Sequence, residues 1–281
     1  MKSVKIIGVP EHFNLPWHMA LDDGAFKDRG ISLEWTDVPE GTGKMAQMLQ
    51  DGEADLAVIL SEGIVKSIID GNPSKIVQTY VQSPLLWGIH TSGNSDIKHI
   101  SELEGKVIAI SRFGSGSHLM AYIHAAQQGW DITALKFKIV HTLEGAVTAL
   151  TQGEADYFMW EHFTTQPLVT DGTFLRIGDF PTPWPCFVLA GNSVFIKENN
   201  ALLNHVLEVI NNYTYDFKRI PSIDKTISNR YSIALESVQQ WLSITEWSEE
   251  QLPTTVVETI QNSLHTLDLI PEKKSADTIL L

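Results

Sequence analysis

Apolar residues along the chain alternate between two spacings. Continuous apolar runs at residues 4–9 (VKIIGV), 54–60 (ADLAVIL) and 106–111 (KVIAIS) are typical of buried strands. Residues 16–28 and 41–52 instead place their apolar side chains on one face of a helix, and a glycine ends or follows each segment. Strands that alternate with helices predict βαβ units and a mostly parallel sheet.

One tetrapeptide, Gly-Glu-Ala-Asp, occurs twice, at residues 52–55 and 153–156, each time between an expected helix and an expected strand. Ligands of open α/β sheets bind beyond the carboxyl ends of the strands, whereas this tetrapeptide lies at the amino end of its strand. We therefore interpret it as scaffold. Its glycine caps the helix, and Asp55 and Asp156 accept backbone N–H bonds where the strands begin.

The repeated strand–helix order predicts two lobes of α/β fold, each a mixed, mostly parallel sheet flanked by helices. The chain crosses between them twice, in QSPLLWGIHTSGNSD and in the proline-rich GDFPTPWPCFVLAGNSVFI, where prolines keep the backbone extended. Two such crossings predict a hinge with a ligand cleft beside it. We expect residues 1–86 plus 188–281 to form the first lobe, including C-terminal helices from residue 200 onward, and residues 87–187 to form the second.

Composition narrows the class of protein. The 281 residues are 43% hydrophobic, and the net charge of −14 argues against nucleic acid or an anionic membrane as partner, since both require a basic surface. One cysteine, Cys186, allows neither an internal disulfide nor a thiolate metal cluster. No apolar stretch approaches the roughly 18 residues of a membrane-spanning helix.

The amino terminus carries no apolar signal-peptide core, so we expect a cytoplasmic protein. A mature exported protein with an added methionine would have the same sequence. In that case the location is periplasmic and a transporter permease becomes a partner.

Three segments carry a family resemblance. Residues 16–35 (PWHMALDDGAFKDRGISLEW) contain the pattern A-x-x-x-G-x-F-x-x-x-G before a strand, and residues 41–58 and 114–120 (GSGSHLM) each contain a glycine-rich helix start. These segments resemble the nitrate/sulfonate/taurine class of substrate-binding proteins, and the resemblance covers roughly residues 4–200. It implies the type II periplasmic-binding-protein fold, in which two lobes close over a small ligand.

The same superfamily includes pyrimidine-binding proteins and a fungal-type thiamine-pyrimidine synthase that consumes its own histidine. The synthase carries a cysteine-rich iron-binding motif, which this sequence lacks because Cys186 is its only cysteine. Without an export signal, the sequence also resembles a family of intracellular binding-protein-like proteins. The resemblance therefore implies a fold and a superfamily rather than one ligand.

Candidate ligand-binding residues follow the expected strands or lie at the hinge. They are Glu11, His12, Phe13, Asn14, Thr42, Gly43, Ser61, Glu62, Arg112, Gly114, Ser115, Gly116, Ser117, His118, Glu144, Trp160, Glu161, His162 and Trp184. Most fall in the segments that leave the carboxyl ends of strands, such as residues 41–43 and 111–118.

Their chemistry suits two kinds of ligand. The segments 41–43 and 114–117 open helices, whose free N–H groups bind phosphate, sulfonate or carboxylate, and Arg112 would pair with such an anion. Equally, Thr42, Ser115 and Ser117 are ordinary helix caps, and Arg112 is a surface arginine or the partner of a nearby carboxylate.

Aromatic and acidic residues point to a different ligand. Trp160 and Trp184 offer ring faces for a planar heterocycle, although core packing explains aromatic residues equally well. The four candidate carboxylates, Glu11, Glu62, Glu144 and Glu161, would accept hydrogen bonds from ring N–H or amino groups, or would be solvated loop charges of an acidic protein.

Catalytic and metal-binding motifs such as HExxH and GxSxG are absent from the sequence. We assign no catalytic residue, metal ligand or cofactor. The sequence predicts a binding protein that closes two lobes over a small anionic or heteroaromatic ligand, sulfonate-like or pyrimidine-like. The alternative is an enzyme of thiamine-pyrimidine or related cofactor-precursor biosynthesis that uses the same cleft.

Overall fold

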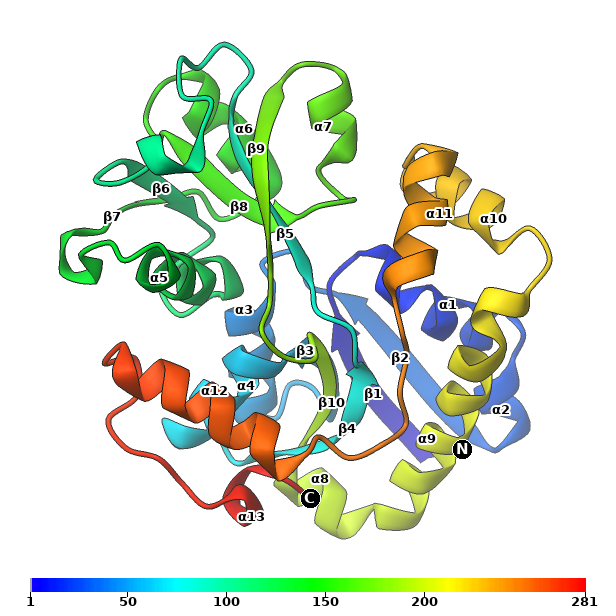
Figure 1. Ribbon diagram of the computed structural model, residues 1–281. Helices are drawn as coiled ribbons and strands as arrows, with labels where there is room; N and C mark the ends of the chain where they lie inside the picture. Colours follow the sequence, from blue (N-terminus) through cyan, green and yellow to red (C-terminus); the bar gives the residue numbers. More distant parts are fainter. Residues whose placement is uncertain (1) are drawn as a thin grey trace.

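The computed structural model describes residues 2–281 and contains two five-stranded mixed sheets, each at the centre of one lobe (Figure 1). The sheet of lobe I has the strand order β2-β1-β3-β10-β4, and the sheet of lobe II has the order β7-β6-β8-β5-β9. The strands of lobe I are β1 (Lys2–Gly8), β2 (Ile31–Asp37), β3 (Leu56–Leu60), β4 (Ser74–Val81) and β10 (Phe187–Asn192). Those of lobe II are β5 (Leu86–Ser92), β6 (Val107–Ile110), β7 (Lys136–Ile139), β8 (Tyr157–Glu161) and β9 (Phe174–Pro181).

The two sheets share one topology. In lobe I, β1 pairs in parallel with β2 and β3, and β10 runs antiparallel between β3 and β4. In lobe II, β6 pairs in parallel with β7 and β8, and β5 runs antiparallel between β8 and β9. Each lobe therefore has four strands in one direction and one reversed strand, as the alternating strand and helix patterns predict.

Helices cover both sheets (Figure 1). They are α1 (Leu15–Asp22), α2 (Ala25–Asp28), α3 (Thr42–Gln50), α4 (Ser61–Ile69), α5 (Gly116–Gln127), α6 (Leu143–Thr151), α7 (Gln166–Thr170), α8 (Ser193–Glu198), α9 (Asn200–Asp216), α10 (Ile223–Tyr231), α11 (Leu235–Ile244), α12 (Thr254–Thr266) and α13 (Ala276–Ile279). No helix formed by residues 2–281 is both long enough and apolar enough to cross a membrane.

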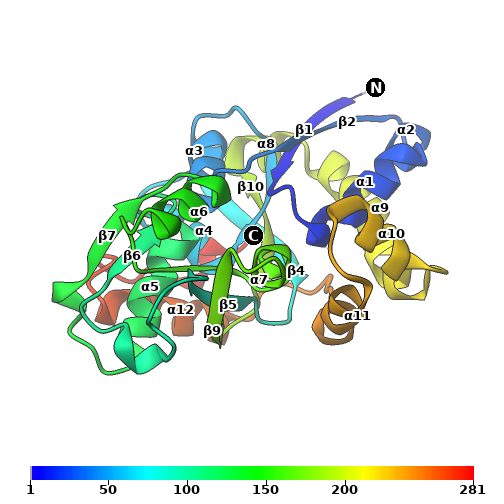
Figure 2. The ribbon, with the colours of Figure 1, turned by 90° about the horizontal axis from the view of Figure 1, so that it is seen from above.

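The C-terminal helices pack on lobe I, as predicted. Helix α9 contacts α1 and α2, while α12 contacts α4. Figure 1 and Figure 2 both show α9, α10 and α11 on the side of lobe I that faces away from β6 and β7.

The single helix expected over residues 16–28 is in fact two helices. Helix α1 ends at Asp22, and Gly24 then adopts a left-handed conformation with φ of 75° before α2 begins at Ala25. A residue with this positive φ interrupts the helical hydrogen bonding. The apolar stripe remains continuous across the break because Trp17 and Phe26 are both buried and stack at 6.0 Å between ring centroids.

The repeated tetrapeptide is scaffold, as predicted from its position. Gly52 and Gly153 follow the ends of α3 and α6 with φ of 72° and 71°. The Asp55 carboxylate accepts the Lys5 N–H of β1 at 2.8 Å, and the Asp156 carboxylate accepts the Val107 N–H of β6 at 2.7 Å. Each aspartate therefore ties the start of its own strand to the neighbouring strand.

Two linkers join the lobes, residues 82–85 after β4 and residues 182–186 after β9. They are hydrogen-bonded to each other. The Thr182 N–H donates to the Leu85 carbonyl at 2.9 Å, and the Leu85 N–H donates to the Thr182 hydroxyl at 2.9 Å. These bonds make the double crossing one paired hinge rather than two independent strands.

Replacing Asp55 or Asp156 with alanine should lower the free energy of unfolding by about 1–2 kcal/mol per site, because each change removes a charged acceptor from a backbone N–H. Urea denaturation measures the loss. Glu53→Ala is the matched control, since Glu53 is the exposed neighbour in the same tetrapeptide. Equal stability of the Asp55 variant and this control would contradict the scaffold role.

Candidate functional site

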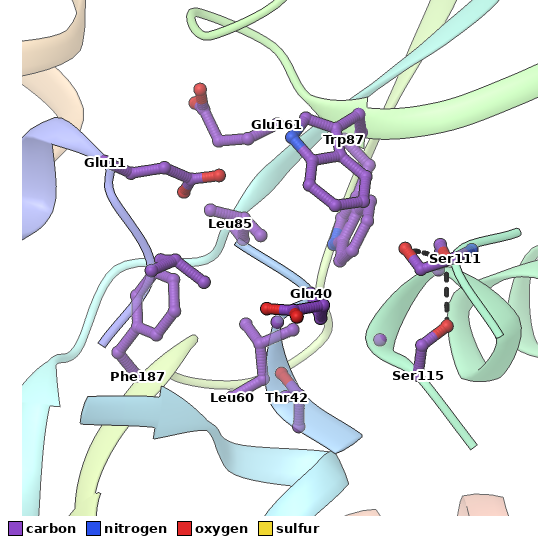
Figure 3. A pocket seen from close by; sticks show the side chains of 15 residues that line it. Glu11, Glu40, Thr42, Leu60, Leu85, Trp87, Ser111, Ser115, Glu161 and Phe187 are labelled. Atoms are coloured by element: carbon purple, nitrogen blue, oxygen red, sulfur yellow. Dashed lines mark hydrogen bonds between the residues drawn. The ribbon is translucent and has the colours of Figure 1, made fainter. Parts of the chain in front are cut away.

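A cavity lies between the lobes at the carboxyl ends of the parallel strands (Figure 3). Its volume is about 440 Å³ including the mouth, and its interior is narrow. The lining residues are Val9, Glu11, Glu40, Gly41, Thr42, Leu60, Leu85, Trp87, Ser111, Ser115, Gly116, Ser117, Trp160, Glu161 and Phe187. Both lobes contribute, so the cavity takes this shape only while they are close together.

All charged side chains in this lining are carboxylates. Glu11 follows β1, Glu161 ends β8, and the exposed Glu40 lies at the end of the loop after β2. No lysine, arginine or histidine lines the cavity within the described part of the chain. Figure 3 shows Glu11 and Glu161 at the same end of the cavity, although they belong to opposite lobes.

Burial sets the protonation of this acidic end. The pKa of the half-buried Glu11 is raised to about 8, first by burial and second by the facing Glu161 carboxyl, against a smaller lowering by a polar contact with the Trp160 indole. Burial also raises the pKa of Glu161, against the hydrogen bonds that it accepts from the following backbone. Two carboxyl groups that share a poorly hydrated space disfavour a double negative charge, so this end of the cavity holds protons readily.

Two buried polar atoms in the lining have no hydrogen-bond partner. They are the Trp87 indole Nε1, which is a donor, and Glu161 Oε1, which is an acceptor when ionised. Trp87 and Glu161 are directly paired across β5 and β8, and directly opposite residues of an antiparallel pair project from the same face. A buried polar group without a partner is costly. The cavity therefore presents an unfilled donor beside an unfilled acceptor.

A cluster of hydroxyl groups lies across the cavity at the start of α5. The Ser115 hydroxyl, labelled in Figure 3, caps the helix by accepting the His118 N–H at 3.3 Å. It also contacts the Ser117 hydroxyl at 3.0 Å. The Ser111 N–H in turn donates to Ser117 Oγ. The N–H groups of Gly116 and Ser117 are the first two of the helix and have no acceptor within it. They supply donors across the cavity from Glu11 and Glu161 (Figure 3).

Arg112 bridges the lobes without lining the cavity. Its guanidinium donates to the Glu40 carbonyl at 2.9 Å and to the Gly41 carbonyl at 3.3 Å. A Cβ atom on Gly43 would lie 3.0 Å from Arg112 Nε, so this glycine lets the guanidinium approach the start of α3. The residue expected to pair with an anionic ligand therefore pairs with carbonyl groups of the opposite lobe.

Seven of the predicted site residues line the cavity: Glu11, Thr42, Ser115, Gly116, Ser117, Trp160 and Glu161. The others lie outside its lining. His12, Phe13 and Asn14 are buried beneath it, where the His12 ring packs 4.4 Å from that of Trp241. Burial lowers the pKa of His12 to about 3, so this histidine is neutral.

Three further predicted residues lie behind the cavity at the hinge. The Ser61 hydroxyl donates to the Pro185 carbonyl at 2.6 Å, and the Trp184 indole donates to the fully buried Glu62 carboxyl at 2.9 Å. These contacts join the start of α4 to the second linker. They give Ser61, Glu62 and Trp184 a place in the hinge.

The remaining predicted residues are more distant or turned away. His118 packs among aromatic rings and accepts the Gly114 N–H at 3.0 Å, while Glu144 is exposed on α6. His162 follows Glu161 directly, but its ring points to Asp179 and Arg176 of β9.

Of the eight other lining residues, Gly41 and Ser111 lie in the segments 41–43 and 111–118 that the sequence pointed to, and sequence reasoning missed six: Val9, Glu40, Leu60, Leu85, Trp87 and Phe187. Trp87 is the second residue of β5 and Phe187 is the first of β10, and both strands run antiparallel to their neighbours. A reversed strand brings its amino end to the edge where parallel strands bring their carboxyl ends. The two crossing segments were visible in the sequence, and their reversed direction is the signal that would have located these residues.

Comparison with protein families gives one partial match. A family model described as Ca3427-like PBP matches residues 87–180, which span β5 to β9. A comparison with curated proteins finds no match. The resemblance to periplasmic-binding-protein-like families is thus confirmed over lobe II.

Solved structures extend the likeness over the whole chain. A Candida albicans CA3427 gene product, described as having the generic periplasmic binding protein fold, is 24% identical with a TM-score of 0.91, covering 100% of this chain and 96% of that one. The alkanesulfonate-binding protein SsuA from Xanthomonas axonopodis pv. citri, bound to MOPS, is 15% identical with a TM-score of 0.84, covering 99% and 98%. The aliphatic sulphonate binding protein SsuA from Escherichia coli is 16% identical with a TM-score of 0.73, covering 100% and 92%. The predicted two-lobed type II periplasmic-binding-protein fold is confirmed.

The buried Glu62 predicts a pH-dependent stability. Burial raises its pKa from 4.5 to about 7, although the Trp184 bond lowers it. Between these values the folded protein holds a proton that the unfolded chain releases, so the free energy of unfolding falls as pH rises from 4.5 to about 7. Glu62→Gln removes this contribution, which is at most about 3 kcal/mol. Urea denaturation of both proteins at several pH values should show that the free energy of unfolding of the variant increases relative to that of the wild type as pH rises. A constant difference would contradict the raised pKa.

Proposed function

We propose that the protein binds a small heteroaromatic molecule, neutral or cationic and bearing hydrogen-bond donors, between its two lobes. The observation that carries this proposal is the unpartnered, buried Glu161 Oε1 in a cavity whose charged lining groups are all carboxylates. A ring N–H or amino group would satisfy this acceptor. A neighbouring ring nitrogen would accept from Trp87 Nε1, as in an aminopyrimidine edge.

The character of the lining supports a planar ring. Leu60, Leu85, Trp87, Trp160 and Phe187 give the cavity large apolar walls, and ligand sites combine such walls with a few placed polar groups. The Gly116 and Ser117 N–H groups lie across from the carboxylates, where they would accommodate an acceptor substituent of the ring. The narrow interior suits a single ring.

A sulfonate is the competing ligand, favoured by the structural likeness to two sulfonate-binding proteins and by the helix start at α5. Electrostatics argues against it. Glu11 and Glu161 would face the anion across a poorly hydrated space, and the Arg112 guanidinium is already occupied by two carbonyl groups. An anion here would require both carboxyl groups to stay protonated and would have no cation beside it, whereas a ligand donor group can pair with an ionised Glu161.

Closure of the lobes would couple to binding. We propose residues 1–86 plus 188–281 and residues 87–187 as the two moving bodies, joined at the paired linkers. A ligand that touches Glu11 in lobe I and Glu161 in lobe II gains both contacts only in the closed arrangement, so it shifts the population toward closure.

Thermal unfolding against a panel of compounds tests the ligand class. The panel contains aminopyrimidines and their phosphates, aliphatic sulfonates, nitrate, bicarbonate and small dicarboxylates. An aminopyrimidine at about a hundred times its dissociation constant should stabilise the protein by about 2.7 kcal/mol. Glu161→Gln should weaken that compound by about 1.5–3 kcal/mol, because a charge-assisted hydrogen bond becomes a neutral one.

Glu144→Gln is the matched control, because Glu144 is exposed on α6 outside the cavity. It should leave the affinity unchanged. Stabilisation by sulfonates alone, with tighter sulfonate binding in Glu161→Gln, would replace the proposed ligand class with an anionic one.

Arg112→Ala tests the closure mechanism. Loss of its two bonds to the opposite lobe should remove about 1–2 kcal/mol from the closed state. Small-angle X-ray scattering of the ligand-free protein should then show a larger radius of gyration, and aminopyrimidine affinity should fall. The control is Arg29→Ala, which breaks an exposed pair with Glu208 remote from the hinge. Identical scattering of wild type and Arg112→Ala would contradict a closing role for this arginine.

A further inference from the structure

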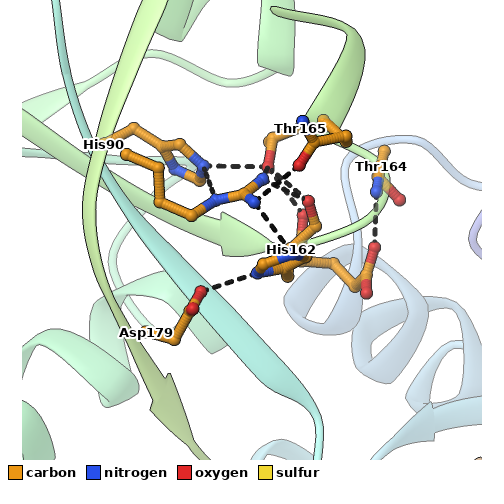
Figure 4. Close-up of polar contacts among 8 residues, drawn as sticks. His90, His162, Thr164, Thr165 and Asp179 are labelled. Carbon is orange, nitrogen blue, oxygen red and sulfur yellow. Dashed lines mark hydrogen bonds and ion pairs between the residues drawn. The ribbon is translucent and has the colours of Figure 1, made fainter. Parts of the chain in front are cut away.

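Arg176 on β9 is the centre of a polar cluster that includes His90, His162 and Thr165, which Figure 4 labels. Its NH2 donates to the His162 carbonyl at 2.6 Å and to the Thr165 hydroxyl at 3.3 Å. Its NH1 donates to Gln166 Oε1 at 2.7 Å and to His162 Nε2 at 2.8 Å, and its Nε donates to His90 Nε2 at 3.3 Å. A guanidinium has five N–H donors, and all five are used here.

The neighbours of Arg176 leave room for this arrangement only because Gly88 has no side chain. A Cβ atom on Gly88 would lie 2.9 Å from Arg176 Nε and 2.5 Å from the His90 ring. Gly88 is also paired across the sheet with Trp160 on one side and Asp179 on the other. The guanidinium therefore lies in a space prepared by the sheet itself.

His162 is held in one tautomer by its two neighbours. Its Nε2 accepts from Arg176, so its Nδ1 carries the proton and donates to Asp179 at 2.7 Å (Figure 4). Both ring nitrogens are thereby occupied, and the ring is turned away from the cavity. This explains why the residue next to Glu161 does not line the site.

The same segment determines where the Glu161 carboxyl points. The Thr164 N–H donates to Glu161 Oε2 at 2.6 Å, and the Thr165 hydroxyl donates to the Glu161 carbonyl at 3.0 Å. One carboxyl oxygen is thus anchored by the backbone of residues 162–165, and the other, Oε1, is left without a partner. The position of that free oxygen depends on the conformation of the segment that Arg176 binds.

From these contacts we infer that Arg176 is the positioning residue of the cavity: its guanidinium clamps residues 162–166 so that Glu161 presents one free oxygen to a ligand. The role of Arg176 in ligand recognition rests on the proposed function, whereas its hydrogen bonds to residues 162–166 do not depend on any ligand. Lysine cannot replace it, because an ammonium has three donors and no planar fork to reach five acceptors around it.

The test compares Arg176→Lys with the matched Arg29→Lys, a change at an exposed arginine. Nuclear magnetic resonance follows the Thr164 amide proton as pH is varied. In the wild type its shift should report protonation of Glu161, with a midpoint above the usual range of a glutamate because burial raises the pKa of that carboxyl. The other titratable groups that act on Glu161 are Glu11, His162, Arg176 and Cys186.

Arg176→Lys should shrink the amplitude of this titration and move its midpoint down toward that of a solvated glutamate. Hydrogen exchange of the Thr164 amide should accelerate at least about tenfold, while β6 amides remain protected. Affinity for the aminopyrimidine found in the thermal panel should fall about tenfold, and Glu161→Gln should add little to that loss in the double variant. Arg29→Lys should change none of these.

An unchanged Thr164 titration and exchange rate in folded Arg176→Lys protein would overturn the inference. If that variant does not fold, Gln166→Ala replaces it; this change removes one acceptor of Arg176 and should produce the same shifts at smaller amplitude, and no shift in it would equally overturn the inference. Absence of binding by every panel compound would overturn the proposed function alone, because the Thr164 measurements need no ligand.

Discussion

The double crossing between the lobes is the constraint on which the rest of the structure depends. Each sheet receives its reversed strand from the other lobe: β5 leaves β4 of lobe I, and β10 leaves β9 of lobe II. The two linkers are hydrogen-bonded to each other through Thr182 and Leu85, so they lie side by side between the lobes. Because a reversed strand begins where the parallel strands end, the same crossing delivers Trp87 and Phe187 to the cavity. The hinge and the walls of the site therefore have one origin.

Closure also assembles the electrostatics of the cavity. Glu11 belongs to one lobe and Glu161 to the other, so the closed arrangement brings two carboxyl groups into one poorly hydrated space. In separated lobes each carboxyl group would be hydrated, and its ionisation would cost no more free energy than that of an exposed glutamate. Repulsion between the ionised carboxylates is therefore relieved when they take up protons or bind donor groups of a ligand. An anion would instead add to the negative charge. Under the proposed function, the acidity of the site would favour donor-bearing ligands and would couple their binding to closure.

The regular parts of this fold were predictable because they follow from local patterns. Apolar runs located the strands, and the position of Asp55 and Asp156 at strand starts identified the repeated tetrapeptide as scaffold. The rule that ligands bind beyond strand ends led to Glu11, Ser115, Trp160 and Glu161. It did not lead to Trp87, whose strand runs the other way, since strand direction is decided by pairing between segments far apart in sequence. Nor did it show that Arg112 donates to the Glu40 and Gly41 carbonyl groups, because that contact forms only between the lobes.

His162 shows most clearly how tertiary contacts divide neighbouring residues between roles. Glu161 and His162 are adjacent, both polar, and both follow the strand expected from the sequence. The sequence alone therefore gives no reason to assign them different roles. At the end of a strand successive side chains point to opposite sides. The side that His162 faces already contains Asp179 and Arg176, which occupy its two ring nitrogens, while the side that Glu161 faces is the cavity. The His162 ring is therefore held by bonds to both of its nitrogens and does not reach the cavity. The Glu161 carboxyl keeps one oxygen free. A ligand site of this kind is defined less by which polar residues are present than by which of their atoms the surrounding protein leaves unsatisfied.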